Sequence, residues 1–429
     1  MAIIGFFFGL LLLLLIIGVP VAITLGFVSS SWILYHGANV QMIASRTYAG
    51  LNQFVIMAIP FFILAGEIMN RSGITLRIIK FVNYVVGRVR GGLAQANIYT
   101  SLLFAGITGA AISDVSALGS IFIPAMEKQG YTRKFSAMIT AASSIVGPII
   151  PPSIIVVIYA GITGTSVGAL FAAAIIPGLF IGLSMSVMVA LMGKKKNLPK
   201  VDVAFKVKEF ASTFKDTILA LLMPIIIIGG ILGGVFTPTE AAAVAVFYAL
   251  LVSVLIYRTL NASALWQCIR KSVRTSAMLF FIIGLASILG WIITRINLPQ
   301  ILANYFLAIS DVPSVVFLLV VVLLLFVGTW LETGAACIIL APILAPMMEL
   351  LGFHPIHFAT VMLITLNVGL VTPPLGVCLF AAVSVGDICF EDIVSEIWPF
   401  LILFFFVILI LVFVPEITLT LPRYLGFIR

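Results

Sequence analysis

The chain has 429 residues, of which 62% are hydrophobic and 9% are charged, and its formal net charge is +8. This much apolar side-chain surface excludes a soluble globular protein and predicts a multi-pass protein embedded in the lipid bilayer. The positive charge alone would suit nucleic acid, but we interpret it as Lys and Arg in cytoplasmic loops that orient the chain, and we expect no nucleic-acid partner.

The first predicted elements are three membrane helices, at 2–17, 19–36 and 53–70. The first of them lacks the basic start and the small-residue cleavage site of a signal peptide, so we expect it to be retained. Lys and Arg then gather in four clusters, at 71–90, 128–134, 194–215 and 258–274. If these clusters are cytoplasmic, the three helices place the N-terminus in the periplasm.

After the third helix, residues 74–90 mix basic and apolar side chains in a pattern typical of an amphipathic helix on the inner membrane surface. Residues 92–126 form an apolar stretch with basic residues at both ends and Gly106-Ile107-Thr108-Gly109 near the middle. Basic residues at both ends of the stretch place both ends on the same side of the membrane, which predicts a re-entrant helical hairpin. Two short full spans would also satisfy the flanks, but neither half of the stretch is long enough.

A broken helix is predicted at 135–162. This segment contains Gly147 and the adjacent Pro151 and Pro152 within an apolar stretch. Proline lacks the N–H that an α-helix needs, and its ring clashes with the preceding turn. A membrane helix therefore cannot stay continuous at this point.

The same pattern recurs in the second half of the chain at a constant offset. Val146-Gly147-Pro148-Ile149-Ile150-Pro151-Pro152 returns as Val368-Gly369-Leu370-Val371-Thr372-Pro373-Pro374, an offset of 373 − 151 = 222 residues. This offset predicts a second hairpin at about 312–350 and a second broken helix at about 356–385. No Lys or Arg flanks the second hairpin, so we expect it to open from the outside.

The predicted fold is therefore an all-α polytopic membrane protein with two inverted-topology repeats, 1–200 and 217–429, joined by a cytoplasmic linker at 201–216. Each repeat contains one re-entrant hairpin and one broken helix. Helices broken at matching positions of two halves are the best sequence indication of the binding site of a secondary transporter. Unwound carbonyls suit a small cation such as Na⁺ and half-helix N-termini suit an anion, which predicts two cation sites flanking one substrate site.

Several charged residues are candidates for this chemistry. Asp114 and Glu332 stand inside the predicted hairpins, where a buried charge is costly and usually functional, with helix capping as the alternative for Asp114. Glu67 is interpreted either as half of an ion pair with an arginine or as part of the transport chemistry. Arg295 would either hold a substrate carboxylate or contact a partner or the membrane interface.

Other patterns have structural interpretations. Thr237-Pro238-Thr239-Glu240 predicts a capping box at the start of a helix. His354 and His357 resemble a metal pair, but we place them in an exposed loop without a third ligand. The four cysteines are expected to be buried free thiols. No P-loop or hydrolase motif occurs in the sequence, so we predict a protein that is not an enzyme and that uses a gradient rather than ATP.

These motifs together resemble one known family, the large membrane subunit of the tripartite ATP-independent periplasmic (TRAP) transporters. The resemblance covers essentially the whole chain and depends on four segments, Ala58-Ile59-Pro60-Phe61-Phe62-Ile63-Leu64-Ala65-Gly66-Glu67-Ile68-Met69, 106–119, Gly147-Pro148-Ile149-Ile150-Pro151-Pro152-Ser153 and Gly233-Gly234-Val235-Phe236-Thr237-Pro238-Thr239-Glu240-Ala241. It implies a sodium-coupled importer of organic acids in the bacterial inner membrane. It also implies a periplasmic substrate-binding protein, a small four-helix membrane subunit on a separate chain, and an elevator in which hairpins and broken helices move against a scaffold of outer helices and interfacial arms.

The resemblance also implies particular site residues. The first Na⁺ site would use Gly106, Thr108, Asp114, Gly147, Pro151 and Ser153. The second Na⁺ site would use Gly328, Thr329, Gly369, Thr372 and Leu375. The substrate would contact Ser113, Ser116, Glu332, Thr333, Pro152, Pro374 and Arg295.

The resemblance, through the second hairpin tip and the general character of the chain, also implies a substrate class. Gly328-Thr329-Trp330-Leu331-Glu332 differs from the Asp-containing tip of dicarboxylate-type members and resembles the sialic-acid branch, which implies N-acetylneuraminate as the substrate. Two other classes stay open. A stand-alone sodium–dicarboxylate symporter would normally show Ser-Asn-Thr tips, which are missing here, and a channel would need a continuous polar pore.

Overall fold

The protein is helical throughout the described part of the chain. The computed structural model describes residues 2–200 and 206–428, apart from the side chains of residues 2–4 and 106–108, and contains no strand within those ranges. Seven of the described helices are long and apolar enough to cross a bilayer, or eight if the bent pair 298–309 and 313–328, which meets at 112°, counts as one span. The predicted all-α polytopic fold is confirmed.

The first half agrees closely with the predicted helices and adds one. Its helices are α1 (Ala2–Ile16), α2 (Val21–Tyr35), α3 (Gln41–Leu51), α4 (Ala58–Arg71), α5 (Ile74–Val86), α6 (Gly92–Thr108), α7 (Ala111–Lys128), α8 (Arg133–Ser144), α9 (Ile154–Thr163) and α10 (Val167–Lys195), with a 3-10 turn η1 (Phe54–Met57) before α4. The sequence did not predict α3, because this helix is short and carries polar residues such as Arg46 and Thr47 in place of a long apolar run.

The second half starts inside the segment that was predicted to be a linker. Its helices are α11 (Val207–Leu232), α12 (Pro238–Leu250), α13 (Ala262–Arg295), α14 (Leu298–Ile309), α15 (Pro313–Gly328), α16 (Thr333–Leu350), α17 (Pro355–Gly369), α18 (Val377–Gly386), α19 (Phe390–Phe413) and α20 (Glu416–Tyr424), with a π-helical turn η2 (Leu251–Ile256) after α12. Of the predicted linker 201–216, residues 201–205 lie outside the described residues and the part from Val207 onward is helical. The predicted capping box of Thr237 and Glu240 is present at the start of α12.

The helices are interrupted at both proline pairs, as predicted. Residues 145–153 separate α8 from α9, and residues 370–376 separate α17 from α18; both Pro-Pro bonds, Pro151-Pro152 and Pro373-Pro374, are cis. The helix boundaries follow the sequence offset, because α16 begins at Thr333 and α7 at Ala111, and 333 − 111 = 222. The two halves therefore repeat the backbone pattern in register.

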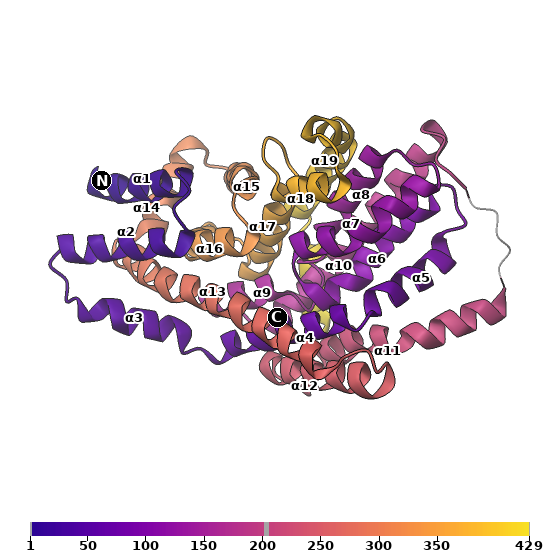
Figure 1. The fold of residues 1–429 in the computed structure, drawn as a ribbon. Coiled ribbons are helices and arrows are strands. Elements are labelled where there is room, and N and C mark those ends of the chain that lie inside the picture. Colours follow the sequence, from indigo (N-terminus) through magenta and orange to yellow (C-terminus); the bar gives the residue numbers. More distant parts are fainter. Residues whose placement is uncertain (1, 201–205, 429) are drawn as a thin grey trace.

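The two halves also pack against each other reciprocally. Helix α9 packs against α16, and its counterpart α18 packs against α7, the counterpart of α16. In the same way α4 packs against α12 while α13 packs against α2. Figure 1 shows the hairpin α6–α7 on the right, the hairpin α15–α16 on the left, and α9, α17 and α18 between them. Reciprocal contacts of this kind are what an approximate two-fold relation between the halves produces.

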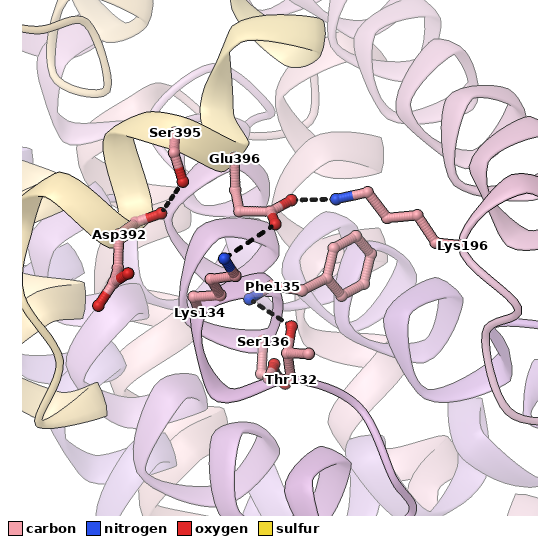
Figure 2. A network of polar contacts seen from close by, with 8 residues as sticks. All are labelled: Thr132, Lys134, Phe135, Ser136, Lys196, Asp392, Ser395 and Glu396. Carbon is pink, nitrogen blue, oxygen red and sulfur yellow. Dashed lines mark hydrogen bonds and ion pairs between the residues drawn. The ribbon is translucent and has the colours of Figure 1, made fainter.

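A polar network ties the first broken helix to its neighbours. Figure 2 shows the Glu396 carboxylate of α19 between the amino groups of Lys134 in α8 and Lys196 at the end of α10. The Lys134 Nζ lies 3.9 Å from Glu396 Oε1, and the Lys196 amino group donates a hydrogen bond to Glu396 Oε2. Thr132 caps α8 by accepting a hydrogen bond from the Phe135 N–H. These contacts fix the start of the helix that leads into the first break.

Two expectations about reactive side chains were wrong. His357 is 1% exposed rather than in an exposed loop, and its Nδ1 lies 2.8 Å from Thr418 Oγ1. Helix α17 carries His357 into the interior, because every residue of this helix from Ile356 to Gly369 is buried. Three of the cysteines are buried as expected, whereas Cys389 is exposed just before α19.

Candidate functional site

The first hairpin tip lies against the first helix break. We call residues 106–114 together with residues 145–153 the first tip–break unit. A Cβ atom added to Gly109 would stand 3.4 Å from Ile154 N and 3.6 Å from Pro152 O, so the tip contacts the end of the break directly. Behind it, Asn97 Nδ2 of α6 donates to Thr140 Oγ1 of α8 at 2.7 Å. Buried polar contacts therefore hold the hairpin on the broken helix.

Asp114 is the buried acid of the first tip–break unit. It is 0% exposed, in the first turn of α7, and its Oδ2 occupies the space where a side chain on Gly147 would otherwise lie. Ser153 is also buried; its hydroxyl donates to the Pro148 carbonyl and caps α9 by accepting from Val156 N. The structure thus brings Asp114, Gly147 and the unwound backbone together, with Pro151 and Pro152 buried beside them.

Two predicted ligands of this unit fall on side chains that are not described. Gly106 and Thr108 belong to the last turn of α6, and their side chains lie outside the described residues. Their assignment to the first Na⁺ site stays a prediction. The backbone of α6 ends at this turn, next to the tip.

The second hairpin tip meets the second helix break through backbone contacts. We call residues 328–333 together with residues 367–376 the second tip–break unit. A Cβ atom on Gly369 would stand 2.6 Å from the Gly328 backbone, and Gly376 N donates to Thr329 O at 2.9 Å. Beside them Thr333 Oγ1 donates to Asn367 Oδ1 at 3.1 Å, with both residues 0% exposed. Asn367 was not singled out from the sequence, although an amide in the apolar helix α17 is the signal that marks it.

The remaining predicted residues of the second unit differ in exposure. Thr372 is half-buried and its Oγ1 donates to Val368 O at 2.8 Å, which leaves the oxygen lone pairs free to accept or ligate. Pro374 and Leu375 are exposed. Glu332 is also exposed and caps α16, with its carboxylate accepting from Ala335 N at 3.2 Å. A cap role is therefore present at Glu332, whereas the buried Asp114 lies inside its helix.

Two cavities open between the helix α13 and the hairpins. The Lys271 cavity, about 480 Å³, lies between α4 and α13 on one side and the first hairpin on the other, and Ser113 and Ser116 line it as predicted substrate residues. The Trp291 cavity, also about 480 Å³, lies between α3 and α13 on one side and α9 and α16 on the other. Both volumes suit a small organic molecule.

Arg295 and Glu67 are bound to groups that the sequence did not indicate. The Arg295 guanidinium lies 5.1 Å from the centre of the Trp291 ring at the end of α13, and it belongs to neither tip–break unit. The Arg46 guanidinium lies 5.5 Å from the same ring. Glu67 pairs with Lys271 at 2.7 Å rather than with an arginine.

The donors gathered at the two units favour a hard cation. A buried carboxylate, hydroxyl oxygens and the carbonyls of unwound backbone are the ligand types that small hard cations prefer. Helices α7, α9 and α16 begin at the units, and the positive ends of their dipoles favour an anion, while Ser153 and Glu332 each accept one of the N–H groups of α9 and α16. The two units therefore present ligand types that suit a cation and, at the helix starts, an anion.

Comparison with known proteins finds one family over almost the whole chain. Residues 8–417 match the family described as "Tripartite ATP-independent periplasmic transporter, DctM component". The chain is 40% identical over 416 residues to the sialic acid TRAP transporter large permease SiaM of Vibrio cholerae, covering 96% of this chain and 97% of that protein. It is 36% identical to the C4-dicarboxylate TRAP transporter large permease DctM of Pseudomonas aeruginosa, covering 92% of each.

A solved structure supports the fold independently. The structure of the Alcanivorax borkumensis YdaH transporter superposes with a TM-score of 0.63, covering 90% of this chain and 87% of that chain, at 14% identity. At this identity the likeness concerns the fold alone.

Proposed function

The chain belongs to the DctM family of tripartite ATP-independent periplasmic transporters, and on this premise we propose that it imports an organic acid driven by a Na⁺ gradient. Its relatives are transporter permeases, and it is not an enzyme. The observation that carries the sodium proposal is the burial of the Asp114 carboxylate against Gly147 at a helix break. A charge in such a place is costly unless a cation or hydrogen bonds balance it.

Two Na⁺ sites are proposed, one at each tip–break unit. Asp114, Ser153 and the carbonyls around Gly147 and Pro151 would form the first site, together with Gly106 and Thr108. Thr372, Thr329 and the backbone of Gly328, Gly369 and Leu375 would form the second. The substrate would lie between them, against the Ser113 and Ser116 face and the tip residues Glu332 and Thr333, with Pro152 and Pro374 at the two breaks and Arg295 at the outer side.

The proposed movement is an elevator of inverted repeats. The hairpins and broken helices would move as one transport domain against a scaffold of outer helices and interfacial arms, and the two cavities along α13 support such a boundary. Lys271 and Arg274 stand near the start of α13, and by the positive-inside rule they support a cytoplasmic location for that end. The N-terminus of the chain would then be periplasmic, in the bacterial inner membrane.

The proposed substrate is N-acetylneuraminate, and two partners are proposed with it. The whole-length likeness to a sialic acid permease supports the substrate. A periplasmic substrate-binding protein would deliver the acid, and a small four-helix membrane subunit would pair with this chain.

Uptake into proteoliposomes tests the function. The chain is reconstituted with the small subunit, and labelled N-acetylneuraminate uptake is measured with and without an inward Na⁺ gradient and with and without the binding protein. We expect uptake only when both the gradient and the binding protein are present. Uptake that is equal without the gradient contradicts the proposal, and gradient-driven uptake of a dicarboxylate without any binding protein would support the stand-alone symporter instead.

A further inference from the structure

The Lys271 cavity has a polar lining that the proposed sodium sites do not use. Helix α4 contributes residues at helical spacing from one face, helix α13 contributes residues one turn apart, and the first hairpin contributes hydroxyl groups from the opposite side. The polar members are Glu67, Asn70, Ser113, Ser116, Lys271 and Thr275. The cavity is thus lined by one cation, one anion and several neutral hydrogen-bonding groups.

The Glu67–Lys271 ion pair contributes little to the stability of the fold. Lys271 Nζ lies 2.7 Å from Glu67 Oε1, and the Lys271 side chain is 62% exposed while that of Glu67 is 24% exposed. An ion pair this open to solvent contributes at most about 1 kcal/mol to stability. An ammonium group has three N–H donors, so Lys271 can bind a second carboxylate while it remains paired with Glu67.

We propose that Lys271 binds the carboxylate of the transported acid in this cavity, and that Glu67 is a positioning residue that holds the ammonium group toward the cavity. This proposal rests on the proposed function and adds a specificity-determining residue to it. Ser113, Ser116, Asn70 and Thr275 offer donors and acceptors for the neutral hydroxyl groups of a sugar acid.

The position of the cavity links the acid to the first tip–break unit. Ser113 and Ser116 face the cavity from α7, whereas Asp114, the residue next to Ser113, is buried on the other side of the same helix against Gly147. An acid bound to Lys271 and the serines would therefore lie against the helix turn that holds the proposed Na⁺ ligand. Movement of this turn would change both sites together.

Binding to the purified membrane complex tests the role of Lys271 without the binding protein. The chain with its small subunit is heated in detergent with N-acetylneuraminate or with its methyl ester, which lacks the negative charge, and the midpoint of thermal unfolding is recorded. A ligand that binds the folded protein raises this midpoint. In the unaltered protein the acid should raise the midpoint more than the ester does, and in Lys271→Met the two ligands should act alike.

Uptake measurements with saturating binding protein complete the test. Lys271→Met should raise the apparent KM for the acid at least about tenfold, which corresponds to losing about 1.4 kcal/mol of binding. Lys271→Arg should retain part of the affinity, and Glu67→Gln should weaken it less than Lys271→Met does. Arg274→Gln is the matched control, because this exposed cation on α13 does not line the cavity.

The exchanged pair Glu67→Lys with Lys271→Glu separates binding from a purely structural ion pair. A structural pair would be restored by the exchange, whereas a carboxylate-binding Lys271 would not. Normal acid binding in Lys271→Met, or in the exchanged pair, overturns the proposal. If the unaltered protein takes up no acid at all, the proposed function fails instead, so the two failures are distinguishable.

Discussion

The two tip–break units share a cis Pro-Pro bond and the starting register of α7 and α16, but they differ in chemistry. In the first unit the acid, Asp114, is 0% exposed within the first turn of α7. In the second unit the acid, Glu332, is exposed and caps α16. The repeat offset maps Asp114 onto Ala336 (336 − 114 = 222) and Glu332 onto Ala110 (332 − 110 = 222), so the acids are not equivalent.

This difference shows what an internal repeat preserves. Glycines and prolines at equivalent places reproduce the breaks, because they act on the local backbone. The polar side chains that line the breaks differ between the two halves, because they do not determine where the backbone breaks. The first unit contains a buried carboxyl group, that of Asp114, whereas the buried polar groups of the second unit include the neutral side chains of Thr333 and Asn367.

Replacing the buried acid should have the largest effect. Asp114→Asn keeps the shape of the side chain but removes the charge, and loss of a charged hydrogen-bonding ligand typically costs about 1.5–3 kcal/mol. We expect the Na⁺ concentration for half-maximal uptake to rise about ten- to hundredfold. The measurement is the Na⁺ dependence of uptake in proteoliposomes.

The matched control for this change is Glu127→Gln on the same helix. Glu127 Oε2 lies 3.8 Å from Arg133 Nε, and the Glu127 side chain is 50% exposed. Loss of this exposed carboxylate should therefore leave the Na⁺ dependence unchanged. An unchanged Na⁺ dependence in Asp114→Asn would show that the first unit does not differ from the second in the way we propose.

Adding a methyl group at the second unit should have the next largest effect. In Gly369→Ala the new Cβ would stand 2.6 Å from the Gly328 backbone, where no flexible side chain can move aside. We expect a loss of about 1–3 kcal/mol of stability, seen as a lower thermal midpoint in detergent together with reduced uptake. Gly229→Ala is the control and should be neutral, because its new Cβ would have no neighbour within 4 Å outside the adjacent backbone of its own helix. A neutral Gly369→Ala would mean that the second tip does not need to contact its break.

Removing the cap at Glu332 should have the smallest effect. Glu332→Ala loses the hydrogen bond to Ala335 N, and loss of an N-cap costs about 1 kcal/mol. We expect a thermal midpoint lower by a few degrees, a higher KM for the acid and an unchanged Na⁺ dependence. Glu332→Asp retains a capping oxygen and should recover the stability. A large change of Na⁺ dependence in Glu332→Ala would make the two units chemically alike.

The sequence by itself determined the features that depend on neighbouring residues. The breaks at Pro151 and Pro373 follow from the missing N–H and the ring of proline, which act within one helical turn. The capping box of Thr237 and Glu240 was likewise predictable, because its two partners are three residues apart. Apolar runs long enough for the bilayer fixed the all-α class, since only helices or closed barrels satisfy the backbone in lipid.

Only the tertiary structure decided which distant residues meet. It paired Glu67 with Lys271, buried His357 against Thr418, and joined Thr333 to Asn367. Each of these contacts depends on how helices far apart in the chain pack together, and no local pattern encodes that packing. The cavities beside α13 arise for the same reason, because a cavity is the space that several packed helices leave between them.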